Sequence, residues 1–183
     1  VTRALPVTYS WSLFAGTTFL GWSSTSLDQR FYKLPAYTLE ASTTYQISVT
    51  ASVTSGSSEI SSYVSSSLVT GQSGVKAVIS GASVRTGSTL ENVVIDASAS
   101  SDIDYPSTGT LSYTWSCAEY SPDYGAVCAG FVASTTNSQT IAAGTVAANQ
   151  YTITVTVENS AGKVSTQSVL LTLLETSIPN IVM

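Results

Sequence analysis

The segment Leu111-Ser112-Tyr113-Thr114-Trp115-Ser116-Cys117 has a close counterpart near the N-terminus, Val7-Thr8-Tyr9-Ser10-Trp11-Ser12-Leu13. Both copies alternate apolar and polar residues, which predicts a strand with one buried face. In each copy a Tyr and a Trp lie two residues apart and therefore share a face. A second alternating strand that begins at a tyrosine follows each copy, at Tyr45–Val53 and at Tyr151–Val157. This repeat predicts two β-sandwich units in tandem.

The length and composition of the chain agree with this division. A chain of 183 residues has room for two immunoglobulin-like sandwiches of about ninety residues each. Charged residues make up only 9% of the chain, against a usual value of about 25%. Ser and Thr take their place, and a hydroxyl-rich, β-branched composition favours strands over long helices. We therefore expect an all-β fold, with residues 1–72 and 73–175 as the two units.

Charge and hydrophobicity exclude two classes of partner. The net charge is −5, and the six basic residues are scattered singly, so the chain has no basic patch for nucleic acid. The longest apolar run lies within residues 169–174 and is too short to span a bilayer. We expect neither nucleic-acid binding nor membrane insertion.

The two cysteines, Cys117 and Cys128, flank a turn-rich segment. A disulfide between them is favoured over two free thiols, and it would place the protein outside the cytosol. A metal site is disfavoured because the chain has no histidine and no further thiol.

Weaker signals complete the second unit. Val75–Ile79 and Val93–Ala97 read as its first strands, separated by a turn at Gly87. Phe131–Val132 and Gln139–Ile141 are further strand candidates. The closing strand is predicted at Val164–Leu174, after a turn that contains Gly162.

Three of these segments carry a resemblance to a known family. Val94–Asp102, Leu111–Cys117 and Tyr151–Val157 together resemble a PKD-type immunoglobulin-like domain. The Trp-x-Cys ending and the nearby second cysteine are more similar to the related receptor-for-egg-jelly (REJ) modules. The Phe-Gly-Asp-Gly turn that follows the Trp in bacterial-type PKD domains is absent. The resemblance covers residues 75–174 well and residues 5–70 in part. It implies an extracellular, cell-surface spacer or adhesive unit, and it names no partner.

The first unit is predicted to be incomplete. Two strand candidates precede the Trp115 strand, whereas only residues 1–6 precede the Trp11 strand, so an edge strand is missing from the first unit. Beyond the second unit, residues 176–183 hold a candidate donor strand made of Ile178, Pro179, Asn180, Ile181, Val182 and Met183. We expect this strand to pair with the open edge beside Val1–Leu5 and Val7–Leu13 of a neighbouring chain.

The expected function is therefore structural. Head-to-tail strand complementation between copies of the chain would build a fibre or surface array. Alternatively, the residues belong to a longer array in which adjacent repeats supply the missing strand. The rival function is a binding segment of an adhesion receptor that recognises glycan or protein.

Candidate site residues are few. Trp11, Trp115, Tyr45 and Tyr151 are expected in the cores rather than on a sugar-binding platform, because sandwiches of this kind bury such aromatic residues. Asp96, Asp102 and Asp104, which lie in one loop, are a candidate Ca²⁺ site, although Asp and Ser also form such turns without metal. No other cofactor is expected.

No catalytic pattern stands out. The absence of histidine excludes the usual Ser/His/Asp and Cys/His arrangements, so we expect no enzyme activity. Ser- and Thr-rich tracts are candidate sites for O-linked glycans; they lie at residues 17–18, 23–26, 55–58, 61–62 and 65–67.

Overall fold

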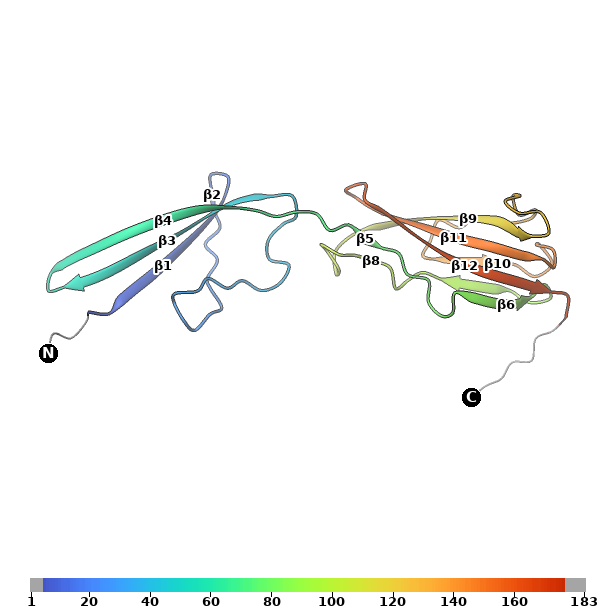
Figure 1. Cartoon of the computed structure of the whole chain (residues 1–183), viewed down its shortest axis with the longest axis horizontal. Coiled ribbons are helices and arrows are strands. Elements are labelled where there is room, and N and C mark those ends of the chain that lie inside the picture. The colour runs from blue at the N-terminus through green and yellow to red at the C-terminus, as the bar shows by residue number, and fades with distance from the viewer. Residues whose placement is uncertain (1–4, 177–183) are drawn as a thin grey trace. The chain divides into compact units, whose positions relative to one another are not determined.

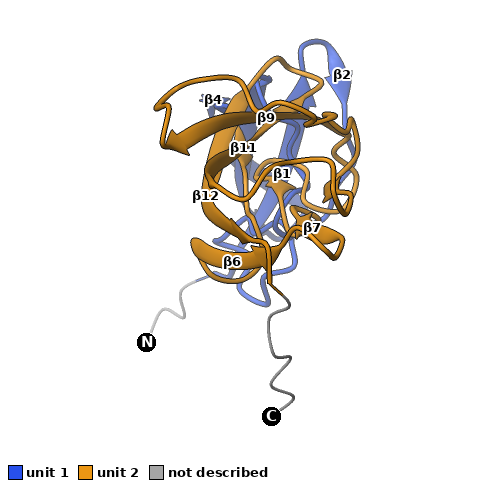
Figure 2. Ribbon diagram, turned by 90° about the vertical axis from the view of Figure 1, so that its right-hand side faces the viewer, with its two compact units in different colours: residues 1–72 blue, residues 73–183 orange. Residues whose placement is uncertain are grey.

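The structure is a computed structural model that describes residues 5–176, and the regular structure in this range is entirely β-strand. The chain divides into two compact units, Val1–Gln72 and Ser73–Met183 (Figure 2). Among the described residues, no helix is long and apolar enough to cross a membrane. The candidate donor strand, Ile178–Met183, lies outside the described residues.

Unit 1 is built on one antiparallel sheet of four strands in the order β2-β1-β3-β4 (Figure 1). Its strands are β1 (Val7–Ala15), β2 (Thr18–Phe19), β3 (Thr44–Ser55) and β4 (Ser58–Val69). Gly16 and Gly56 open the two-residue turns that join β1 to β2 and β3 to β4, and both have a positive φ. A glycine in the first turn position is what a tight hairpin of type II′ requires.

Strand β4 is the longer of two strands in unit 1, beside the two-residue β2, that the sequence analysis did not identify. It pairs with β3 from Thr44↔Val69 to Ser55↔Ser58, and all its residues are exposed. Its serine-rich sequence resembles a loop. The ladder with β3 nevertheless gives half of its backbone groups hydrogen-bond partners, and the other half face outward from the sheet edge.

Unit 2 has two layers. One is a four-stranded sheet in the order β6-β12-β11-β9, in which β6 runs parallel to β12 and the other pairs are antiparallel. The other layer contains the ladders β7–β10 and β5–β8. Figure 2 shows the whole of unit 2 in orange, with β7 on the other side of the unit from β12. The strands are β5 (Val75–Lys76), β6 (Val84–Ser88), β7 (Val93–Asp96), β8 (Ser101–Asp102), β9 (Leu111–Ser121), β10 (Ser138–Ile141), β11 (Gln150–Asn159) and β12 (Val164–Leu174).

The core of unit 2 lies between these layers. Alternate residues of β11, beginning with Tyr151, are buried, and they pack against the inward residues of β12 and β9 and against β7 and β10. The fully buried members include Ile95, Ile153, Val155, Val157 and Leu171. This arrangement is an immunoglobulin-like sandwich, which confirms the predicted all-β fold of tandem immunoglobulin-like units.

One strand prediction in unit 2 was too long, and another was wrong. Val75–Ile79 forms a strand only at Val75–Lys76, because the next amides bond to side chains instead: Ala77 N–H to Ser165 Oγ (3.2 Å) and Ile79 N–H to Gln167 Oε1 (2.6 Å). Phe131–Val132 is not a strand. The Val132 carbonyl accepts a hydrogen bond from the Gln139 side chain, and Val132 itself is exposed.

The predicted turn at Gly87 was also wrong. Gly87 lies inside β6, where it pairs with Leu173 of β12. A Cβ at this position would lie 2.7 Å from Val93 Cγ2 and 3.2 Å from Leu173 Cδ2. The glycine is therefore needed for close packing between the layers rather than for a turn.

Candidate functional site

The sheet of unit 1 has one apolar and one polar face. The β1–β3 and β3–β4 registers place Trp11, Val49 and Val64 in one row across the sheet. Because side chains alternate along a strand, every second residue from each of these positions shares that face. We call it the unit 1 apolar face; its members are Val7, Tyr9, Trp11, Leu13, Ala15, Tyr45, Ile47, Val49, Ala51, Val53, Ile60, Val64 and Leu68 with the serines between them on β4.

The segment 20–43 covers one end of this face. The Trp11 indole N–H donates to the Gln29 carbonyl (2.9 Å), and its ring stacks on Tyr32 with centroids 5.6 Å apart. Leu13 and Tyr45 belong to the covered end of the face and are each only 2% exposed. In Figure 1 the segment runs beneath the half of the sheet that carries β2.

The rest of the unit 1 apolar face, along β4 and at the end that holds Val7, Val53 and Ile60, is open to solvent. Ile60 is 71% exposed, Val64 is 64% exposed and Val7 is 45% exposed. Val49 and Val53, on the central strand, are only half-buried. In a finished sandwich these positions would face a second sheet.

A shallow groove of about 430 Å³ lies between residues 9–11 of β1, Phe19 and the segment 20–43. Half of the residues that line it are aromatic, namely Tyr9, Trp11, Phe19, Trp22, Phe31 and Tyr32, and the rest include four serines. The Tyr32 hydroxyl donates to the Trp22 carbonyl (2.7 Å), and burial raises the pKa of this phenol. Beside the groove, a hydrogen bond from the Arg30 guanidinium lowers the pKa of Asp28 to about 2.

Hydroxyl groups fix the segment that forms the groove. Ser24 Oγ donates to the Phe31 carbonyl and accepts the N–H groups of Ser26 and Lys33. Thr25 Oγ1 donates to the Lys33 carbonyl at 3.1 Å. This part of the predicted glycan-bearing tract 23–26 therefore has a structural use for its hydroxyls.

The outer edge of β1 is a second open feature of unit 1. Strand β2 pairs only with Phe14 and Ala15, and the Leu20 N–H donates to the Leu13 carbonyl. Along residues 7–12, the described part of the chain places no strand against this edge. Such an edge is a template for an added strand.

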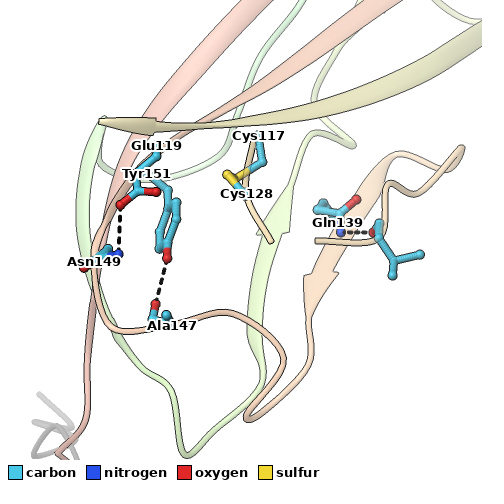
Figure 3. The surroundings of a disulfide bond; sticks show 8 residues. Cys117, Glu119, Cys128, Gln139, Ala147, Asn149 and Tyr151 are labelled. Atoms are coloured by element: carbon cyan, nitrogen blue, oxygen red, sulfur yellow. Dashed lines mark hydrogen bonds between the residues drawn. A yellow bond between two sulfur atoms is a disulfide. The ribbon is translucent and has the colours of Figure 1, made fainter. Parts of the chain in front are cut away.

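The two predicted core tyrosines occupy equivalent positions in their units. Tyr151 is 3% exposed and donates its hydroxyl to the Ala147 carbonyl (3.0 Å; Figure 3). Tyr45 is buried to the same degree, and its hydroxyl accepts the Glu40 N–H (2.8 Å). A tyrosine at the start of this strand that bonds to upstream backbone is the tyrosine corner of immunoglobulin-like domains. Burial, with a smaller contribution from the charge of Glu119, raises the pKa of Tyr151.

The two predicted core tryptophans differ. Trp115 is 2% exposed and donates its N–H to the Thr136 carbonyl at 2.9 Å. Trp11 makes the corresponding bond to Gln29 but is only half-buried.

Cys117 and Cys128 form a disulfide, as the sequence predicted, with their Cα atoms 5.6 Å apart (Figure 3). The loop that it closes is tied by the Glu119 N–H to Ala126 carbonyl bond (2.7 Å) and by the Gly125 N–H to Glu119 carbonyl bond (2.8 Å). The Asn149 side chain donates to Glu119 Oε1 (2.8 Å) and joins this loop to the start of β11.

The three aspartates of the candidate Ca²⁺ site accept hydrogen bonds from different donors. Asp96 accepts from Ser98 and Ser80, and the Ser98 N–H lowers its pKa. Asp104 accepts the Ser73 N–H, which lowers its pKa in the same way.

Asp102 is buried and bridges two segments instead. It accepts the Asn159 amide (2.8 Å) and the Asp104 N–H (2.9 Å). Within residues 5–176, no three acidic, Cys or His side chains gather into a group that could hold a metal ion.

Sequence reasoning missed the contribution of β4 to the unit 1 apolar face. Ile60, Val64 and Leu68 alternate with serines in the register of a strand, at every fourth residue. The signal was present, but the serines between them hid it. The aromatic pair of Phe31 and Tyr32 was missed because a non-repetitive loop carries no periodicity.

The sequence model of the REJ domain family matches residues 2–182 of the chain. No curated protein matches it. Among solved structures, three N-terminal domains of the outer capsid protein Hoc of bacteriophage RB49 align with a TM-score of 0.43 and 15% identity, over 91% of this chain and 48% of that one.

Two further structures are similar at the same level. The insect immune protein hemolin gives a TM-score of 0.41 and 12% identity, over 93% of this chain and 44% of that one. Cadherin domains 1–5 of protocadherin gamma B2 give 0.44 and 17%, over 93% of this chain and 34% of that one. The chain thus spans about half or less of the length of each. Similarity at these scores adds nothing to the architecture described above.

Proposed function

This chain belongs to the REJ domain family, and from that premise we propose that it is a non-catalytic module of an extracellular surface protein that makes adhesive contacts through unit 1. The observation that carries the proposal is the contrast between the units. Unit 2 buries its apolar sheet face between two layers. In the described part of unit 1, by contrast, much of the apolar face, the outer edge of β4 and the β1 edge along residues 7–12 are open. Exposed apolar surface of this extent is typical of interaction sites.

One further observation supports the extracellular role. The disulfide is of a kind that persists outside the cytosol. The exposed serines of β4 also offer hydroxyls for O-linked glycans, which would keep its polar face soluble.

Bead adhesion tests this proposal. Beads coated with the whole chain are compared with beads coated with residues 73–183, a unit whose core is built from its own residues. We expect whole-chain beads to adhere to each other or to cells of the source organism, and unit 2 beads to remain dispersed. Equal behaviour of the two kinds of bead would contradict the proposal.

The open edge of β1 favours a second candidate, the assembly of fibres by strand complementation. In this scheme residues Ile178–Met183 of one chain pair with the Val7–Ser12 edge of the next. A backbone ladder needs N–H donors, so Ile181→Pro should block assembly as removal of residues 176–183 does. Negative-stain microscopy and sedimentation of these two variants beside the intact chain test it. Filaments formed equally by all three, or by none, would rule it out.

A further inference from the structure

We propose that two copies of this chain pack their unit 1 apolar faces against each other and so complete a β-sandwich between them. The proposal rests on the proposed function, in which unit 1 makes the contacts, and it names the partner as a second copy. Each copy contributes one layer, with the strands of the two layers about 30° apart and the sheets about 10 Å apart.

Unit 2 supplies the physical template. Its row Trp115–Val155 corresponds to the row Trp11–Val49 of unit 1, because each Trp pairs across the sheet with a valine of the tyrosine-led strand. In unit 2 this row is covered by a layer that contains β7 and β10, and Val155 is 0% exposed. In unit 1 the same row extends to Val64, which is 64% exposed. The surface that a sheet covers in one repeat is therefore available for a sheet in the other.

The area of the face suits a reversible dimer. Strands β3 and β4 have 12 residues each, so the face is about 40 Å long at about 3.3 Å per residue. Three long strands at about 4.8 Å spacing make it about 14 Å wide, or roughly 600 Å² in projection. Stable interfaces bury about 800 Å² per partner, and smaller ones belong to transient complexes. Since segment 20–43 covers one end, we expect a weak dimer.

The charge distribution favours a copy as the partner. Unit 1 has three basic side chains (Arg3, Arg30, Lys33) and three acidic ones (Asp28, Glu40, Glu59), so its net charge is zero. The whole charge of −5 therefore resides in unit 2. The unit 1 apolar face itself contains no charged residue. A two-fold contact places like surfaces together, which an uncharged face tolerates and a charged face does not.

Neighbouring residues of β4 provide a matched test. Val64 lies on the unit 1 apolar face and Tyr63 on the opposite face, and they are 64% and 76% exposed. In analytical ultracentrifugation of the whole chain we expect a reversible dimer. Val64→Glu should raise the dissociation constant at least about tenfold, because it buries an unpaired carboxylate in the contact. Tyr63→Glu should leave the dissociation constant unchanged.

Thiol labelling guards against a variant that merely fails to fold. Val64→Cys and Tyr63→Cys both keep an uncharged side chain at the site. We expect the thiol at position 64 to be labelled more slowly as protein concentration rises, and the thiol at position 63 to be labelled at a constant rate.

The outcomes separate this proposal from the broader one. The dimer would be overturned if the parent chain stays monomeric, if Val64→Glu dimerises as tightly as the parent, or if the two thiols are labelled equally. Whole-chain beads that adhere only to cells, together with a monomeric chain, would assign the face to a different partner and leave the adhesive function standing. Whole-chain beads that stay dispersed would contradict both the dimer and the adhesive function.

Discussion

Units 1 and 2 contain the same three-stranded sheet, made of β1, β3 and β4 in one and of β9, β11 and β12 in the other, but they bury it differently. Of the buried apolar residues in the described chain, only Leu13 and Tyr45 belong to unit 1. The other buried residues form the core of unit 2. The comparison shows that an amphipathic sheet specifies its own register, and that its stability depends on what covers the apolar face.

The largest effect is expected from the paired variants Trp115→Ala and Trp11→Ala. Loss of the buried indole should cost unit 2 about 3–5 kcal/mol of unfolding free energy. In dilute protein, Trp11→Ala should cost unit 1 about 1–2 kcal/mol, because that side chain is only half-buried. Hydrogen exchange of β11 and β3 amides, followed by mass spectrometry, reports each unit separately. Equal losses would show that the two sheets are covered equally well.

The disulfide should stabilise unit 2 alone. Replacing both cysteines, as Cys117→Ala with Cys128→Ala, removes a cross-link over 11 residues and should cost about 2–3 kcal/mol. Unit 1 has no cysteine and serves as the internal control in the same sample. Chemical denaturation should show one transition moved to lower denaturant and one unmoved. A shift in both transitions would mean that the units unfold together.

The two tyrosine corners allow the stability of the units to be compared at one buried hydrogen bond in each. Tyr151→Phe and Tyr45→Phe each remove one hydroxyl hydrogen bond to upstream backbone, worth about 1 kcal/mol. Because both side chains are buried to the same degree, we expect similar losses in the two units. Urea denaturation of the two variants measures this. A much smaller loss for Tyr45→Phe would show that water reaches the Tyr45 hydroxyl as unit 1 fluctuates.

The smallest expected effect is on the loss of stability at acid pH. The pKa values of Asp28 in unit 1 and Asp104 in unit 2 are lower in the folded chain than their ordinary value. The stabilisation that each ionised carboxylate gives the fold is therefore complete above about pH 4. It is lost as the pH falls through the lowered pKa, which is about 2 for Asp28. Asp28→Asn and Asp104→Asn should each reduce the fall in unfolding free energy between about pH 5 and about pH 2.

Salt distinguishes these two carboxylates. The partner of Asp28 is the charged, exposed Arg30 side chain, whereas Asp104 accepts the backbone N–H of Ser73. Added salt should weaken the contribution of Asp28 and leave that of Asp104 nearly unchanged. Thermal melts across pH at low and high salt make the measurement. Equal salt dependence for the two sites would contradict this assignment.

Much of the fold was predictable because strand alternation is a local property. The closing strand Val164–Leu174 was predicted with the bounds that the structure gives it. The disulfide and the tyrosine-led strands were also identified, since each depends on residue type and spacing along one segment. Strand β4 was not identified, because serines separate its apolar residues and hide the alternation. Strand β5 was predicted too long, because hydrogen bonds from the next amides to side chains leave no mark on the alternation of residues.

The order of residues is enough to predict most strands and the apolar side of each, because side chains alternate along a strand with a period of two. How far those faces are covered depends on the tertiary structure. Trp115 and Trp11 lie in near-identical local sequences, yet one is enclosed by a second layer and the other remains half-open. Burial depends on residues distant in the sequence, so no local pattern distinguishes the closed unit from the open one.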